Sequence, residues 1–137
     1  MAAVWQVDEE EASELRLALV EAGLVERTPR DGEPRYALHQ VIAHFARARL
    51  AADPGEERAA ALAHARHYSH VVGGYDDAIR EERMTYGAPL EWENVAVALE
   101  RLAAQSAADD EAAAILLDYA RSWRNVLTPL KELAYRV

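Results

Sequence analysis

The stretch RYALHQVIAHFARARL, residues 35–50, decides how the neighbouring sequence folds. Its first four residues carry the large apolar side chains, Tyr36 and Leu38, at alternate positions, as in a short strand, and the remainder repeats apolar residues at helical spacing. We therefore predict a strand over 35–38 and a helix over about 39–52, with His39 at the junction between them. The face of this helix that we expect to pack inward holds Ile42, Phe45, Ala46 and Leu50.

The residues before this stretch predict a helix and a hairpin. Acidic residues at 8–11 suit a helix N-terminus, and apolar residues then recur at helical spacing until Gly23, which fits a left-handed C-cap. We expect this helix over about 8–22. Residues 24–27 and 35–38 read as two strands joined by a long loop, 28–34, whose Asp-Gly pair and two prolines indicate a projecting wing. Tyr36 and Leu38 are expected to point inward.

After the break at Asp53-Pro54-Gly55 the pattern is helical. Gly73-Gly74 predicts the end of one helix, 75–84 a shorter and weaker one, and Pro129 the start of a short tail. The apolar stripes of the helices are Leu62, Ala65, Ser69 and Val72, with Tyr68 at the edge; then Trp92, Val95, Leu99 and Leu102; then Ala112, Ile115, Leu116, Tyr119, Trp123 and Val126. Helices joined by short loops indicate antiparallel pairs, as in an α-solenoid or a small bundle.

We therefore predict a mainly α fold in two domains. Residues 1–53 would form the C-terminal portion of a winged helix with a small β-hairpin wing, and residues 54–137 an antiparallel, α-solenoid-like helical arm. No regular repeat period is visible, so a standard tetratricopeptide array is only weakly indicated.

Composition and charge limit the function classes. Of the 137 residues 29 are alanine, which favours close-packed helices, and the absence of cysteine excludes thiol chemistry and fits a cytoplasmic protein. No apolar run is long enough for a membrane span, so we expect a soluble chain. Residues 1–53 hold 10 acidic and 6 basic groups and residues 54–137 hold 14 and 9, so the net charges are −4 and −5. Both halves should repel a phosphate backbone.

No motif in the sequence assigns catalysis. A G-x-x-x-x-G-K-[ST] loop is absent, and the carboxylates are scattered along helices, so we predict a non-enzymatic chain with no catalytic residue. The spacing of His64, His67 and His70 spreads the three rings across a helix surface, and a polar helix edge explains them better than a metal site. We therefore predict no metal site.

Two segments carry a resemblance to a known family. Trp5-x-x-Asp8, the pattern AselRlaLveagLV at 12–25 and RYALHQ at 35–40 resemble the end of the winged-helix domain of STAND signalling ATPases of the NB-ARC type. In that family a Met-His-Asp or Leu-His-Asp triplet follows the wing; the matching triplet here is Leu38-His39-Gln40, in which Gln40 departs from the commoner acid. The segment Leu90–Leu99 is similar to the E-x-x-N-x-x-x-A-L helix found early in the helical arm of many bacterial members.

The resemblance implies a part of a larger switch. The NTPase elements are missing, so we expect this chain to be a fragment of a longer parent, with ADP or ATP and magnesium bound only in that parent and no cofactor bound here. His39 would contact the β-phosphate of ADP and hold the closed state; the alternative is that His39 merely caps its helix and packs against the wing. The partners would be the parent's own NTPase domain and a protein or sensor region that meets the helical arm.

The rival hypothesis is a small free-standing winged-helix regulator that dimerises or binds DNA. In such proteins the helix before the wing enters the major groove and needs basic or amide side chains. Here that helix presents Arg16 against six carboxylates: Asp8, Glu9, Glu10, Glu11, Glu14 and Glu21. Nucleic acid is therefore not an expected partner of this segment.

Overall fold

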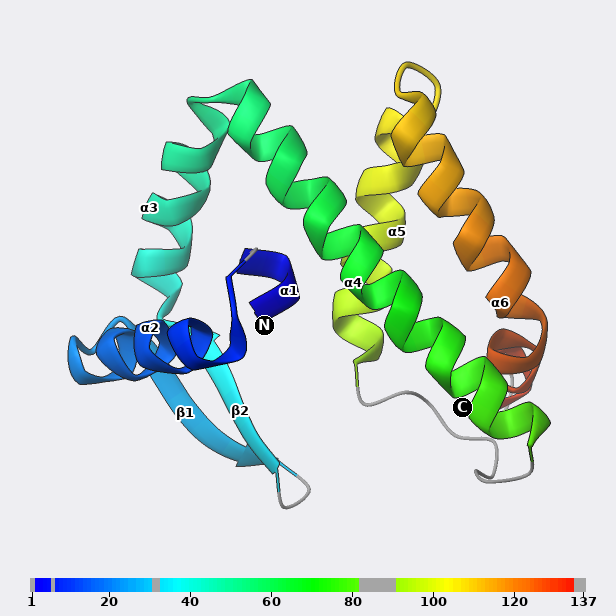
Figure 1. Cartoon of the computed structure of the whole chain (residues 1–137), viewed down its shortest axis with the longest axis horizontal. Helices are drawn as coiled ribbons and strands as arrows, with labels where there is room; N and C mark the ends of the chain where they lie inside the picture. The colour runs from blue at the N-terminus through cyan, green and yellow to red at the C-terminus, as the bar shows by residue number, and fades with distance from the viewer. Residues whose placement is uncertain (1, 6, 31–32, 82–90, 135–137) are drawn as a thin grey trace. The chain divides into compact units, whose positions relative to one another are not determined.

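The computed structural model describes residues 2–5, 7–30, 33–81 and 91–134. The chain divides into two compact units, Met1–Ala60 and Ala61–Val137, and helix α4, Pro54–Arg80, spans the division. The domain boundary that we expected between residues 53 and 54 coincides with the start of α4, whereas the structural division falls inside that helix. The fold is mainly helical with one antiparallel hairpin, as the sequence predicts (Figure 1).

The first unit begins with the short helix α1, Ala2–Trp5, and with α2, Glu9–Glu21. The Asp8 side chain caps α2 by accepting a hydrogen bond of 2.8 Å from the backbone N–H of Glu11. Gly23 follows the helix with φ of +68°, the left-handed conformation that we predicted for it. Sequence signals at both ends of α2 are therefore confirmed.

The hairpin is longer than the sequence predicts. Strand β1 is Val25–Arg30 and β2 is Glu33–Leu38, in a register that pairs Val25 with Leu38 and Pro29 with Pro34. The prediction that 28–34 forms a long loop is therefore wrong; only residues 31 and 32, the predicted Asp-Gly turn, separate the strands, and they lie outside the described residues. Prolines opposite each other fit a non-hydrogen-bonded pair, where neither nitrogen faces the partner strand, so they need not end the ladder.

Helix α3, Gln40–Ala51, follows β2 directly. Ile42 and Leu50 are half-buried as expected, but Phe45 and Ala46 are exposed, so the predicted inward face is wrong at these two positions. Leu38 is also exposed, so the prediction that it points inward is wrong. Tyr36, two residues earlier on the same face of β2, is half-buried. The periodicity identified an amphipathic helix but could not say which apolar residues find a neighbour to cover them.

Helix α4 runs without interruption through Gly73-Gly74, so the predicted helix end there and the separate helix over 75–84 are wrong. Val72 and Ala78 on either side are buried, and burial of this kind outweighs the cost of about 1 kcal/mol for each glycine inside a helix. The start of α4 follows the predicted break. Asp53 Oδ1 accepts from the backbone N–H groups of Gly55 and Glu56, each at 3.0 Å.

The second unit packs α4 against α5, Trp92–Gln105, and α6, Asp110–Ala134. The core of this unit confirms the predicted stripes, and Trp92, Leu99 and Leu116 pack partly buried against it. Ala98, which the stripes did not include, also lies in the core. The buried core residues are Leu62, Ala65, Val72, Val95, Ala98, Leu102, Ala112, Ile115 and Tyr119. The side chains of Trp123 and Val126 lie outside the described part. Helix α6 continues past Pro129, so the predicted restart there is wrong; a proline removes one backbone donor and need not end a long helix.

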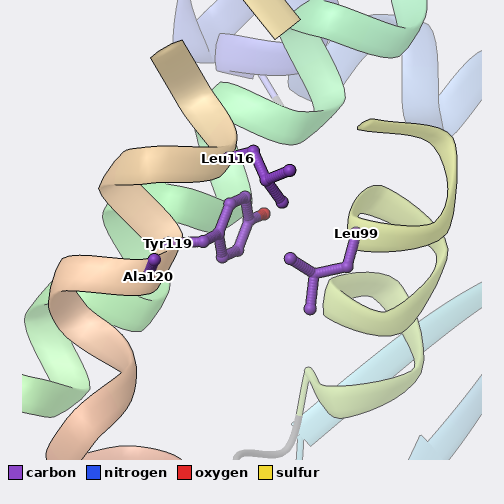
Figure 2. A pocket seen from close by; sticks show the side chains of 4 residues that line it. All are labelled: Leu99, Leu116, Tyr119 and Ala120. Atoms are coloured by element: carbon purple, nitrogen blue, oxygen red, sulfur yellow. The ribbon is translucent and has the colours of Figure 1, made fainter. Parts of the chain in front are cut away.

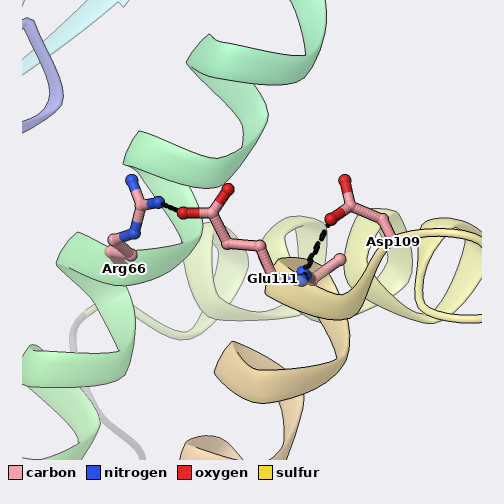
Figure 3. Close-up of polar contacts among 4 residues, drawn as sticks. Arg66, Asp109 and Glu111 are labelled. Carbon is pink, nitrogen blue, oxygen red and sulfur yellow. Dashed lines mark hydrogen bonds and ion pairs between the residues drawn. The ribbon is translucent and has the colours of Figure 1, made fainter.

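Polar contacts fix the start of α6. Asp109 Oδ1 accepts from the backbone N–H of Glu111 at 3.1 Å and of Ala112 at 3.3 Å, while Arg66 of α4 forms an ion pair with Glu111 (Figure 3). Both side chains of that pair are nearly half exposed, so it adds orientation more than stability. Among the described residues, none of the helices combines the length and the apolar character that a membrane span needs.

Candidate functional site

His39 lies between β2 and α3, at the N-cap position of the helix. Its ring nitrogen Nδ1 accepts a hydrogen bond from the backbone N–H of Val41 at 3.4 Å, and its own backbone N–H donates to the carbonyl of Leu24 at 3.4 Å. Both bonds are long, so they hold the residue weakly. The bond to Val41 confirms that His39 caps its helix. Its side chain is exposed, so the expected packing against the wing is not seen.

The cap determines which nitrogen of His39 can donate. A ring nitrogen that accepts a hydrogen bond carries no proton, so the neutral ring bears its hydrogen on Nε2. Nε2–H is then a donor on an exposed ring beside a helix N-terminus, where backbone N–H groups and the helix dipole favour an anion. This arrangement can bind a phosphate oxygen, although among the described residues we identify no second side chain that would complete a nucleotide site.

The outward surface of α2 is acidic. Asp8, Glu9, Glu10, Glu11, Glu14 and Glu21 are all exposed. The single basic residue of this helix, Arg16, is half-buried and lies over the ring of Tyr36, with its guanidinium carbon 5.0 Å from the ring centroid. The position that would enter DNA in a winged-helix regulator therefore presents carboxylates, and its one cation already stacks on the hairpin.

Within the segment that resembles the helical-arm motif, the described residues, 91–99, have structural roles at the start of α5. Asn94 donates through Nδ2 to Oε2 of Glu91 at 2.7 Å, which joins the N-cap residue to the first turn of the helix. Ala98, four residues later, is 1% exposed and lies in the core. The Glu-x-x-Asn spacing and the alanine thus serve the geometry of the helix and its close packing.

One apolar pocket lies between α5 and α6. It has a volume of about 280 Å³ and is lined by Leu99, Leu116, Tyr119 and Ala120 (Figure 2). Its walls offer little besides carbon, and Tyr119 directs its hydroxyl to the carbonyl of Ala65 at 3.0 Å. This pocket can accept an apolar side chain and has no group for acid–base chemistry.

His64, His67 and Tyr68 form a ring cluster on α4. The rings of His64 and His67 have their centroids 4.7 Å and 4.8 Å from that of Tyr68. Burial, and then the charge of Arg101, lowers the pKa of His64, so this ring is neutral at physiological pH. His70 is exposed. No three metal-ligating side chains converge in the part of the chain that the structure describes.

The sequence matches no protein-family model, and no match was found among curated proteins or solved structures.

Sequence reasoning located His39 but not its tautomer, because the acceptor role of Nδ1 follows from a backbone geometry that no pattern encodes. It also missed the pocket and the Tyr119–Ala65 hydrogen bond. The tyrosine in the middle of the apolar stripe of α6 was a signal, since a buried phenol normally needs a hydrogen-bond acceptor.

Proposed function

We propose that this chain is a non-catalytic regulatory and protein-interaction module of a cytoplasmic, nucleotide-switched signalling protein of the STAND type. The first unit would be the end of a winged-helix domain, which relays the nucleotide state of an NTPase domain elsewhere in the parent protein. The second unit would be the start of a solenoid-like helical arm that meets a protein partner or sensor region.

The observation that carries this proposal is the geometry of His39. Its exposed ring lies directly after the hairpin, and the helix cap leaves Nε2–H as the donor, as a contact to a terminal phosphate requires. Such a contact, present only in the closed state, would contribute on the order of 1.5–3 kcal/mol to that state. Removing it would raise the open population by roughly ten- to a hundredfold.

The experiment compares ADP binding to the parent protein with two replacements of His39. His39→Ala removes the cap and the phosphate donor together, whereas asparagine is a good N-cap residue, so His39→Asn keeps the cap and removes the imidazole. Both variants should bind ADP roughly ten- to a hundredfold more weakly in calorimetric titration. The reading frame upstream of Met1 should also encode a P-loop.

The isolated chain provides the control. Without a phosphate cradle it should bind neither ADP nor ATP with magnesium, and His39→Ala should lower its free energy of unfolding by no more than about 1 kcal/mol. Unchanged ADP affinity in the parent, together with strong destabilisation of the isolated chain, would leave His39 a structural cap and exclude the switch role. Gln40 limits the expected effect, because an amide cannot form the ionic contact that an acid would make there.

A further inference from the structure

The outward face of α3 is apolar. Val41 and Phe45, one helical turn apart, are 68% and 64% exposed, and the exposed Ala48 continues the same stripe. A phenylalanine and a β-branched residue exposed on one face exceed the scattered apolar residues that ordinary surfaces carry. We call the residues Val41, Phe45 and Ala48 the α3 stripe.

Positive charge flanks the α3 stripe on both sides. Arg49 follows Phe45 by one turn, and Arg47 lies along the opposite edge; both side chains are exposed. Helix α3 contains no carboxylate, and neither arginine forms an ion pair with any described residue. An apolar stripe between arginines fits a helix face that combines an exposed apolar residue with carboxylates.

Helix α2 carries such a face. Glu10, Glu14, Leu17 and Glu21 recur at i, i+4, i+7 and i+11, the spacing of a single helix surface. All four are exposed, with Leu17 at 59%, and none of the three glutamates has an ion-pair partner among the described residues. We call these four residues the α2 stripe. Its charge is opposite in sign to that of the α3 surface.

We propose that the α3 stripe binds the α2 stripe of a second copy of this chain. Both stripes are exposed within one molecule, so each is open to another molecule. A two-fold axis would let the two copies exchange this contact reciprocally, which gives a closed dimer with two equivalent interfaces. Leu17 would insert beside Phe45, and the glutamates of one copy would face Arg47 and Arg49 of the other.

The first test measures the mass of the full chain by light scattering and sedimentation equilibrium across a wide concentration range. We expect a dimer of the 15.2 kDa chain with a dissociation constant in the micromolar range, weakened by added salt. Phe45→Glu should weaken it by at least about tenfold. Leu117→Glu is the matched control, because Leu117 is 59% exposed in the second unit and should leave the dimer unchanged. Circular dichroism verifies that both variants are folded.

A charge exchange tests the specific pairing. Arg47→Glu with Arg49→Glu should abolish the dimer, as should Glu14→Arg with Glu21→Arg, and mixing the two variant proteins should restore association. A monomer at all concentrations would overturn the proposal and assign the α3 stripe to another protein. So would a dimer that survives Phe45→Glu, or variant proteins that fail to associate when mixed.

Discussion

At the scale of single residues, the Tyr119 hydroxyl joins α6 to α4 through its hydrogen bond to the carbonyl of Ala65. Burial, and secondarily Tyr68, raises the pKa of the Tyr119 phenol well above its usual range, so the group stays a neutral donor. Tyr119→Phe keeps the ring in the core and removes this bond. We expect the free energy of unfolding in urea to fall by about 1 kcal/mol.

Tyr75→Phe is the control for that measurement. Tyr75 also packs partly buried against the core, but its hydroxyl has no hydrogen-bond partner among the residues that the structure describes. Its removal should change stability by less than about 0.5 kcal/mol. Equal losses in the two variants would show that the hydrogen bond contributes nothing specific.

His64 should make the second unit sensitive to acid. Its Nδ1 is buried without a hydrogen-bond partner in the described structure, and burial, followed by Arg101 and His67, lowers its pKa in the folded state. The unfolded chain therefore binds the proton more readily than the folded chain. The free energy of unfolding keeps its full value above about pH 6.5 and decreases as pH falls through that value toward the folded pKa. His64→Phe, which retains a ring beside Tyr68, should flatten this loss.

The measurement is urea unfolding at a series of pH values between neutral and mildly acidic. Burial also lowers the pKa of His67, so His64→Phe should reduce the acid-side loss without abolishing it. His70→Gln, at an exposed position of the same helix, should behave like the unaltered chain. A pH profile unchanged by His64→Phe would contradict the assignment.

At the scale of elements, the continuity of α4 through its glycines is open to a direct test. A Cβ added at Gly74 would meet nothing within 4 Å, and this residue has helical surroundings on both sides. Gly74→Ala should therefore raise the free energy of unfolding by about 0.5–1 kcal/mol, because alanine loses less backbone entropy. If the helix ended at this glycine, as the sequence pattern suggests, the change would destabilise the chain.

Gly23→Ala is the opposite case. Space is also open around Gly23, but its φ of +68° disfavours a residue with a Cβ by roughly 1–2 kcal/mol. Both variants are measured by the same chemical unfolding experiment. Opposite signs for the two substitutions would separate a helical glycine from a capping glycine.

The sequence predicted elements well where burial and periodicity agree. Val95 and Leu102 repeat at helical spacing and both are 1% exposed, so the pattern of α5 reports its packing directly. The sequence-based prediction was wrong where a local rule competes with tertiary structure. The prolines predicted a loop where the chain forms strands, and two glycines predicted a helix end inside α4. The prediction that Phe45 packs inward was wrong for another reason. Hydrophobicity shows that burial of a side chain is favourable, but it does not show that a neighbouring element covers that side chain.

At the scale of the whole molecule, the two units have different kinds of apolar surface. The second unit has a core of large side chains, in which Leu62, Leu102 and Tyr119 are almost completely buried. In the first unit Ala12 is the one fully buried hydrophobic residue among those that the structure describes up to Ala60, while Val41 and Phe45 are exposed. A unit with so small a core gains little from burying its own surface, and association with another chain would add what it lacks.

The charge of the whole molecule leads to the last prediction, which concerns DNA. The net charge is −9, and the helix that precedes the hairpin, α2, exposes carboxylates where a DNA-binding helix needs basic or amide side chains. Counterion release requires cations at the phosphates, and Arg16 is already engaged with Tyr36. Fluorescence anisotropy with a labelled duplex should therefore detect no binding at about 150 mM salt. Replacing Glu10 and Glu14 with glutamine should not create binding, because this change removes two negative charges but supplies no cation to meet the phosphates. Sequence-specific binding by the unaltered chain that survives this salt would exclude the regulatory module in favour of a DNA-binding regulator.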